Sequence, residues 1–239
     1  MKSIVIIGAG EGVGKETALT YGLQGYSVGI IRRDREALEI MLNELASQNI
    51  RAHGIVADVQ NINQLAAAIN DMYKILGRLD ILLYNVPGPL REAYGSILDA
   101  DVALLHKFLD LRIVNALWSI KTALPFLKES NGAIIITSGP SDRIAYPSTA
   151  IIGIAQAGLR MLAMHLAQEL KSYDIYVGYV PLSNPPEYTD KAKDTNRSDV
   201  PAGFQLDNRV QASQVAQLIY KMTALRNQAE LVVEAGTEL

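Results

Sequence analysis

Short apolar runs alternate with longer segments of helical period, and this alternation constrains the fold more than any other feature of the chain. We predict strands at the apolar runs, several of which have the continuous Val, Ile and Leu character of strands buried on both faces. These runs are residues 4–7, 27–31, 51–56, 79–84, 133–137, 175–180 and 231–233. The segments between them predict helices over residues 13–24, 35–48, 61–76, 100–127, 149–171 and 211–226.

Strands that alternate with helices build βαβ units, and their right-handed crossovers place helices on both faces of a parallel sheet. The sequence therefore predicts an α/β fold, a Rossmann-type doubly wound parallel sheet of seven strands with helices on both faces. Residues 1–239 contain no repeat, low-complexity tract or linker, so one domain is expected. A proline-rich stretch with little apolar periodicity follows the sixth strand, which predicts a lid-like excursion at about residues 182–208.

Composition argues against several classes of protein. Hydrophobic residues make up 49% of the chain, but no uninterrupted apolar stretch reaches the ~18 residues of a membrane helix, so no membrane partner is expected. There is no cysteine, and His53, His106 and His165 are scattered, so neither disulfides nor a metal site is expected. A net charge of −3 without a long basic run argues against nucleic acid. The first residues lack the pattern of a cleavable signal, which favours a cytoplasmic location.

The junction between the first strand and the first helix is rich in glycine: Gly8, Gly10, Gly12 and Gly14. Glycines allow a sharp turn and a close approach to a pyrophosphate, and the amides of a helix N-terminus, here beginning at Val13, hold the anion. The phosphate loop of nucleotide triphosphatases would need glycine at Ala9 and a hydroxyl residue at Glu16. The junction therefore predicts dinucleotide binding.

The end of the second strand distinguishes the two nicotinamide dinucleotides. An acidic residue there suits the ribose hydroxyls of NAD, whereas a basic one suits the 2′-phosphate of NADP. Arg32 and Arg33 occupy this end, and Asp34 is predicted to be the N-cap of the next helix, so NADP (NADPH) is favoured over NAD. The alternative is that both arginines are solvated surface charge. The carboxylate of nearby Glu11 also argues against NADP, because it would repel the 2′-phosphate.

Further landmarks follow in order along the chain. Gly8, Gly12 and Gly14 fit a T-G-x-x-x-G-x-G loop in which Ile7 replaces the threonine, and residues 84–88, Tyr-Asn-Val-Pro-Gly, are a variant of an N-N-A-G turn that includes Asn85. With these landmarks the chain resembles the short-chain dehydrogenase/reductase family over essentially its whole length. The resemblance implies a nucleotide-dependent oxidoreductase acting on a small molecule that the sequence does not identify.

The resemblance also assigns roles to single residues. Asp58 and Val59 are similar to the family's adenine-contacting pair, and Asn115 to its active-site asparagine. Ser138, which closes the fifth strand, matches the serine that orients the substrate. Pro181 matches the proline after the sixth strand, where the family continues with glycine and then a threonine at the nicotinamide.

The chain departs from the family where protons and hydride are exchanged. The family's Y-x-x-x-K pair is replaced by Ile152 and Gln156, and neither side chain performs acid/base chemistry. Tyr146, in the loop before this helix, is the speculative substitute, and Tyr188 in the predicted lid is a weaker one. Leu182 stands where the family has glycine after Pro181, which predicts a different path for the chain, with Thr189 as the nearest hydroxyl.

Two classes of function therefore remain open. The first is an NADP-dependent oxidoreductase with an atypical, impaired active site, and the second is a non-catalytic protein that senses a nucleotide or serves a structural or regulatory role. The resemblance also implies a homodimer or homotetramer paired through the long helices 100–127 and 149–171. The second of these helices is apolar around much of its circumference, which either a partner subunit or the chain's own lid would cover.

Overall fold

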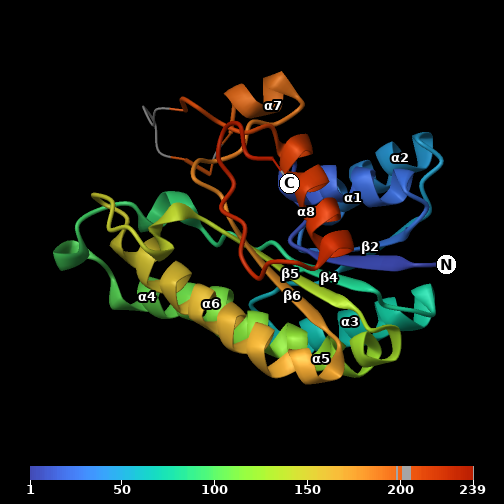
Figure 1. The fold of residues 1–239 in the computed structure, drawn as a ribbon. Coiled ribbons are helices and arrows are strands. Elements are labelled where there is room, and N and C mark those ends of the chain that lie inside the picture. Colours follow the sequence, from blue (N-terminus) through green and yellow to red (C-terminus); the bar gives the residue numbers. More distant parts are fainter. Residues whose placement is uncertain (198, 201–205, 239) are drawn as a thin grey trace.

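The computed structural model describes residues 1–197, 199–200 and 206–238. Its centre is a six-stranded parallel sheet in the order β3-β2-β1-β4-β5-β6 (Figure 1). The strands are β1 (Ser3–Ile7), β2 (Ser27–Arg32), β3 (Ala52–Val56), β4 (Ile81–Tyr84), β5 (Ala133–Ser138) and β6 (Tyr176–Pro181). The chain builds outward from β1 and then reverses direction at β4, so the predicted doubly wound parallel sheet is confirmed.

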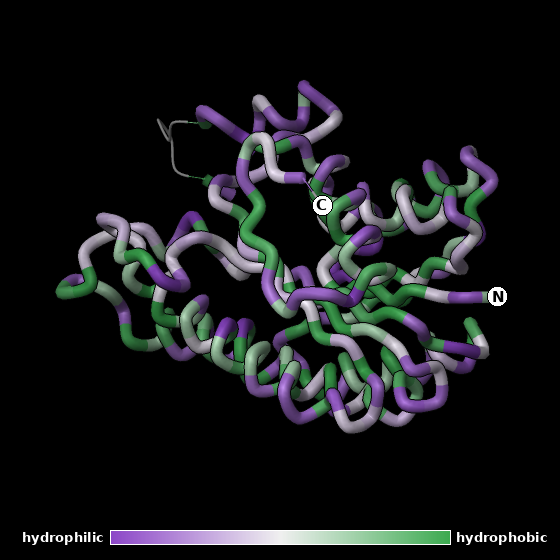
Figure 2. The backbone as a smooth tube through the Cα atoms, viewed as in Figure 1, coloured by the Kyte–Doolittle hydropathy of each residue, from purple (hydrophilic) through white to green (hydrophobic). Residues whose placement is uncertain are grey.

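Helices cover both faces of this sheet (Figure 1). One face carries α1 (Val13–Leu23), α2 (Arg35–Ser47) and α8 (Ala212–Leu225), and the other carries α3 (Ile62–Leu76), α5 (Asn115–Ser130) and α6 (Ala150–Glu169). Successive residues of a strand point to opposite faces, so Ile6 joins the first core and Ile7 the second. Burial on both faces explains why the central strands β1 and β4 are almost entirely hydrophobic (Figure 2).

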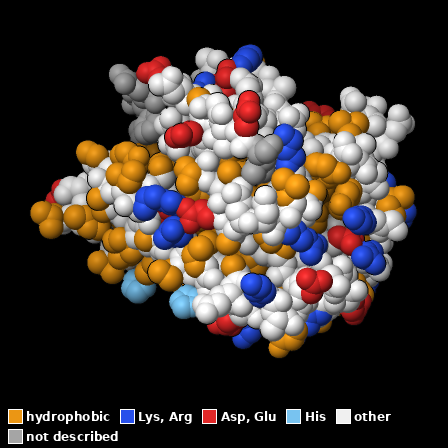
Figure 3. Space-filling view, viewed as in Figure 1, with side chains coloured by type: hydrophobic (Ala, Val, Ile, Leu, Met, Phe, Trp, Pro, Cys, Tyr) orange, Lys and Arg blue, Asp and Glu red, His pale blue; other side chains and the backbone are white. Residues whose placement is uncertain are grey.

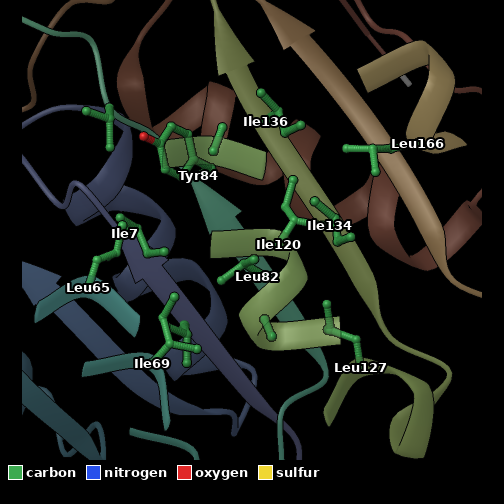
Figure 4. Close-up of a cluster of buried hydrophobic side chains, with 14 of the residues drawn as sticks. Ile7, Leu65, Ile69, Leu82, Tyr84, Ile120, Leu127, Ile134, Ile136 and Leu166 are labelled. Carbon is green, nitrogen blue, oxygen red and sulfur yellow. The ribbon is translucent and has the colours of Figure 1, made fainter. Parts of the chain in front are cut away.

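The core on the α3, α5 and α6 face also positions the site (Figure 4). Tyr84 of β4 is fully buried beside Ile136 of β5 and Ile120 of α5. Its hydroxyl donates to the backbone carbonyl of Leu111, and burial raises the pKa of this phenol well above its usual range. The hydrogen bond holds the turn that contains Leu111 against the carboxyl end of β4.

The helix predicted over residues 100–127 contains an interruption. The structure has α4 (Val102–Leu109), then a π-helical turn, η3 (Asp110–Val114), and then α5. A π-helical turn shifts the register of the residues that face the sheet and is frequent at functional sites. Here Leu111 and Arg112 of the turn are both buried, at 3% and 4% exposure.

The predicted seventh strand, residues 231–233, is reduced to isolated bridges beside β6. Tyr179 pairs with Glu230 and Leu182 with Val233, both in parallel orientation. Val233 donates to the carbonyl of Pro181 at 2.9 Å, but a proline has no N–H to return a bond to the segment opposite. The missing donor interrupts the ladder, so the prediction of seven strands is corrected to six.

The stretch Ala150–Tyr173, which contains α6, is long and apolar enough to cross a membrane by length and composition alone. In this fold Leu159 and Ala163 are fully buried in the core on the α3, α5 and α6 face, and Ala155 is fully buried in a smaller apolar cluster that includes Phe108. The helix therefore serves as a core element, and its composition follows from that burial.

The predicted lid, residues 182–208, is described here except for residue 198 and residues 201–205. Its described part contains the short helix α7 (Lys191–Thr195). Asp194 organises it by accepting hydrogen bonds from both terminal nitrogens of Arg209, at 2.9 and 2.8 Å. The Arg209 hydrogen bonds hold the pKa of the Asp194 carboxyl below its usual range.

Candidate nucleotide site

A cavity of about 1260 Å³ opens at the carboxyl ends of the strands. It extends from the glycine loop after β1 to the ends of β4, β5 and β6, and residues of the lid line its other side. We call it the strand-end cavity. The sheet reverses direction between β1 and β4, and open α/β sheets bind their ligands outside the carboxyl ends of the strands at such a point.

The glycine loop has the close backbone packing that a phosphate cradle needs. Gly8 has φ +86°, and a Cβ there would collide with the backbone carbonyl of Asn85, whose carbon would lie at 2.9 Å. A Cβ on Gly14 would lie 2.6 Å from the Cα of Ala9. Gly10 faces open space, with no atom within 4 Å of its Cβ position. The loop is therefore closed on the protein side and open on the cavity side, which fits a pyrophosphate.

Asn85 connects this loop to two strands. Its amide nitrogen donates to the carbonyl of Gly8 at 2.9 Å, and its amide oxygen accepts from the hydroxyl of Thr137 at 2.6 Å. Val13 begins α1 at the edge of the cavity and is 5% exposed. The structure thus brings Asn85 and Val13 to the glycine loop, where the sequence placed them.

The lid lies on the same loop. The ring of Tyr188 packs on Gly12, with Cε1 at 2.8 Å from the position of a Cβ, so only glycine fits beneath it. Lys193 forms a 2.7 Å ion pair with Glu11, and Thr189 donates to Glu16 at 2.7 Å. These contacts fasten the lid to the loop and to the first turn of α1, and the hydrogen bond to Glu11 raises the pKa of the Lys193 ammonium.

The adenosine end of the cavity is lined by Arg32, Arg33, Asp58 and Val59. Arg32 donates to the carbonyl of Ala37 in α2 at 3.2 Å, so part of its hydrogen-bonding capacity is used by the fold. Arg33 is exposed and forms no ion pair with the described residues.

Two neighbouring carboxylates have local partners. Asp34 caps α2 by accepting from the amide of Ala37 at 3.0 Å, so the predicted N-cap is confirmed. Asp58 accepts from the amide of Gln60 at 2.9 Å. Neither carboxylate forms an ion pair with Arg33.

At the inner end of the cavity, Ser138 closes β5 at 9% exposure, and its partner is Arg112. Nη2 of Arg112 donates to Oγ of Ser138 at 3.1 Å. The resemblance predicts Asn115 as an active-site asparagine, but in the structure its side chain is not the partner of Ser138. The amide of Asn115 instead donates to the carbonyl of Val59 at 2.7 Å, and Asn115 is not among the residues that line the cavity.

Both replaced positions of the Y-x-x-x-K motif line the cavity. Ile152 is 4% exposed and packs in an apolar cluster with Phe108. Gln156 is 5% exposed, and its amide nitrogen would lie 2.5 Å from a Cβ on Gly139. Tyr146 also lines the cavity, is 42% exposed, and donates no side-chain hydrogen bond to the described residues.

Tyr179 of β6 is a further ionisable group at this end. Its hydroxyl is buried and forms no hydrogen bond of normal geometry with the described residues. Burial raises the pKa of this phenol well above its usual range, and nearby Ser138 partly offsets the shift. Tyr179 therefore stays neutral at physiological pH.

The exit from β6 differs from a glycine turn. Pro181 lines the cavity, and Leu182 donates its amide to the carbonyl of Ser138 at 3.1 Å. Leu182 also bridges to Val233, so it prolongs the sheet instead of turning sharply. Leu182 has no positive φ, as expected of leucine.

Sequence reasoning missed Arg112, which lines the cavity, and two residues close to the cavity that do not line it, Tyr179 and Lys193. Arg112 carries a readable signal, because it is a basic residue inside an otherwise apolar stretch that faces the sheet. Tyr179 looks like any aromatic residue of a buried strand. Lys193 becomes visible only when the lid folds back on Glu11, across 182 residues of sequence.

No group of three or more His, Cys, Asp or Glu among the described residues could hold a metal ion. What the site offers is a glycine cradle for a phosphate, a basic patch at one end, and a buried guanidinium with a hydroxyl at the other. Fold and cavity together are those of a Rossmann-type domain with a nucleotide-sized cleft at its topological switch point.

Comparison with known proteins identifies the family. The model of the short chain dehydrogenase family matches residues 2–196. This chain therefore belongs to the short-chain dehydrogenase family, whose members bind NAD(P).

Individual relatives are distant. Dehydrogenase/reductase SDR family member 7B of Xenopus laevis is 26% identical over 184 residues, which are 74% of this chain and 56% of the relative. Tropinone reductase-like 3 of Erythroxylum coca is 23% identical over 201 residues, 82% of this chain and 76% of that protein. The chain thus spans little more than half the length of the first of these relatives.

Solved structures share the fold across the whole chain. A putative oxidoreductase from Escherichia coli superposes with a TM-score of 0.83 at 21% identity, covering 99% of this chain and 97% of the other. An alcohol dehydrogenase from Thermococcus sibiricus, complexed with 5-hydroxy-NADP, gives a TM-score of 0.82 at 14% identity, with coverage of 100% and 99%.

Proposed function

We propose that this protein binds NADP(H) in the strand-end cavity and acts as an oxidoreductase without the tyrosine and lysine of its family. The observation that carries the proposal is the glycine cradle, in which Gly8 and Gly14 exclude any side chain while Gly10 faces the open cavity. When bound, the nicotinamide would supply or accept a hydride. The glycine loop would hold the pyrophosphate, Asp58 and Val59 the adenine, and Asn85 and Pro181 would border the nicotinamide half.

Electrostatics at the adenosine end favours NADP over NAD. Arg33 lines the cavity with no carboxylate partner among the described residues, so it is available for the 2′-phosphate. Glu11, which would repel a phosphate, is paired with Lys193 at 2.7 Å. Lys15 lies 3.7 Å from Glu11 and pairs more closely with Glu44, at 2.5 Å. These pairs remove most of the repulsion that the sequence alone suggests.

Titration with NADPH and NADH, followed by nicotinamide fluorescence, tests the assignment. Removing a charged hydrogen bond costs about 1.5–3 kcal/mol, so Arg33→Ala should weaken NADPH about 10-fold or more and leave NADH nearly unchanged. Arg35→Ala is the matched control, because Arg35 begins α2 but does not line the cavity. Preference of the wild type for NADH, or equal losses for both nucleotides in Arg33→Ala, would refute the NADP assignment.

A non-catalytic nucleotide sensor or regulatory subunit is the second candidate, and one observation favours it. Ile152 and Gln156 occupy the cavity where the family has its proton donor and its lysine, and neither can move a proton. A panel of ketones, aldehydes and enones with NADPH distinguishes the candidates, with Ile152→Tyr/Gln156→Lys assayed alongside. Binding without turnover in the wild type, together with turnover in the double variant, would select the sensor.

We further propose a homodimer or homotetramer in the cytoplasm, paired through the long helices. Apolar side chains are exposed on these helices, including Trp118 of α5 at 40% and Ile154 and Met161 of α6 at 46% and 53%. Apolar side chains gather over the end of the molecule where α4 and α6 lie (Figure 3). A second copy of this chain fits such a surface, because members of the family associate through these helices.

A further inference from the structure

Arg112 is a buried cation without a neutralising anion. The residue is 4% exposed in the π-helical turn η3, lines the strand-end cavity, and forms no ion pair with the described residues. Burial lowers the pKa of its guanidinium, and the phenols of Tyr179 and Tyr84 partly offset this shift. A buried charge without a counter-ion is costly unless it interacts with a ligand or is needed for function.

Neutral acceptors hold the guanidinium in place. Nη1 donates to the carbonyls of Val86 and Pro87, at 3.0 and 3.1 Å, and Nη2 donates to Oγ of Ser138 at 3.1 Å. Nε is buried and has no acceptor. In contrast, Arg143 pairs with Asp142 through Nε and Nη2, at 2.7 and 2.8 Å. Arg112 is therefore fixed in geometry while its charge remains uncompensated.

The direction of the hydrogen bond determines how Ser138 can act. A guanidinium only donates, so the oxygen of Ser138 must accept from Arg112. The hydroxyl proton of Ser138 is then free to point at another acceptor, and Ser138 lines the cavity. A hydroxyl that accepts from a cation is a stronger donor than an isolated one. This end of the cavity is thus suited to an oxygen that carries negative charge.

Among the described residues, neither position of the family's tyrosine and lysine can protonate such an oxygen. Tyr146 lines the cavity but stands outside these two positions, and Tyr179 is not among the residues that line the cavity. Ile152 is apolar, Gln156 is a neutral amide, and the guanidinium of Arg112 keeps its proton. An alkoxide formed from a simple ketone is strongly basic and needs a proton at the oxygen. An enolate is much less basic, and its proton is finally added at carbon.

We propose that Arg112 and Ser138 form an oxyanion subsite, and that the substrates are α,β-unsaturated carbonyl compounds whose carbonyl oxygen binds Ser138. The proposal rests on the proposed oxidoreductase function. A hydride from NADPH, which is thereby oxidised to NADP⁺, would form a C–H bond at the β-carbon, and the electron pair of the C=C bond would move to give an enolate. A proton from water then bonds to the α-carbon. Ser138 is the residue that touches the oxygen, and Arg112 is a positioning residue that acts through it.

A phenolate probe tests the subsite without any nucleotide. Bound 4-nitrophenol reports its ionisation by absorbance, and a subsite for an oxyanion lowers the pKa of the bound phenol. Wild type should therefore bind the phenolate at least about 10-fold more tightly than the neutral phenol, which corresponds to about 1.4 kcal/mol. Arg112→Met and Ser138→Ala should abolish this preference, and Arg112→Lys should retain part of it.

Lys107→Ala is the matched control, because Lys107 is a cation that lines the same cavity without contacting Ser138. Its preference for phenolate should match that of the wild type. Thermal unfolding monitors the fold of each variant, since Arg112 also holds the turn after β4. Even if Arg112→Met fails to fold, the proposal is overturned when wild type prefers neutral phenol, when Ser138→Ala keeps the full preference, or when Lys107→Ala loses it.

The outcome separates the subsite from the proposed function. Loss of NADPH binding together with retained phenolate preference would remove the oxidoreductase proposal and leave the oxyanion subsite. NADPH binding without any phenolate preference would remove the oxyanion subsite and leave the proposed oxidoreductase function. With both present, enones should be reduced in preference to saturated ketones, and Arg112→Lys should lower kcat more than it raises KM. Preference for saturated ketones would overturn the substrate class.

Discussion

Replacement of Gly8 by alanine tests whether the glycine cradle is built by the fold itself. Gly8 has φ +86°, and a Cβ there would collide with the carbonyl group of Asn85. A left-handed conformation costs an L-residue about 1–2 kcal/mol, and forcing an extra carbon into a packed site costs about 1–3 kcal/mol. Gly8→Ala should therefore destabilise the protein by about 2–5 kcal/mol.

Gly10→Ala is the matched control, because a Cβ at Gly10 meets no atom within 4 Å. Its free energy of unfolding should stay within about 0.5 kcal/mol of the wild type, although the methyl group enters the space proposed for the pyrophosphate. Urea unfolding followed by circular dichroism measures both variants. The expected loss of unfolding free energy in Gly8→Ala corresponds to a decrease in Tm of roughly 4–20 °C for a chain of this size. Equal stability of Gly8→Ala and Gly10→Ala would refute the reasoning.

Two further predictions concern the lid and the assembly. Asp194→Asn should speed hydrogen exchange of the lid amides at neutral pH, since Asp194 accepts two hydrogen bonds from Arg209. Because the folded pKa of Asp194 is lowered from 3.8, its stabilisation is present above that value and lost as pH falls through the folded pKa, so variant and wild type should converge in strong acid. Trp118→Glu on α5 should shift the protein to a monomer by analytical ultracentrifugation, whereas Leu225→Glu, also exposed but on α8, should not. A difference in exchange rate between Asp194→Asn and wild type that persists in strong acid would contradict the first prediction. A monomeric wild type would contradict the second.

The sheet and its flanking helices were predictable because local composition and global burial agree. Ile4–Ile7 is apolar at every position, as a strand must be when helices cover both faces, and the structure places β1 at Ser3–Ile7. The seventh strand failed for a reason that is visible in the chain, since Pro181 removes one donor from the ladder that residues 231–233 needed. The composition of a strand predicts its burial, but pairing with a neighbouring strand also requires an N–H donor at each hydrogen-bonding position.

The glycine loop was predictable because local geometry determines its conformation, whereas the inner end of the cavity was not. A regular α-helix over residues 100–127 offers no reason to prefer Arg112 over Asn115 as the neighbour of Ser138. The π-helical turn at Asp110–Val114 decides between them, and it depends on tertiary contacts such as the bond from Tyr84 to Leu111. Similarly, Lys193 reaches Glu11 only because the lid folds back over the loop.

The two ends of the strand-end cavity differ in how their charges are balanced, and this difference connects the proposals. Near the glycine loop, Glu11 is neutralised mainly by Lys193, whereas the exposed Arg33 has no ion pair with the described residues. At the inner end Arg112 is a buried cation without an ion pair among the described residues, and backbone carbonyls and Ser138 hold it in a fixed orientation. An exposed cation suits a phosphate that arrives from solvent, whereas a buried one is most effective on charge that develops during a reaction. Loss of the family's proton donor therefore removes proton transfer to oxygen but leaves electrostatic stabilisation of an oxyanion, which is why an enolate fits this cavity better than an alkoxide.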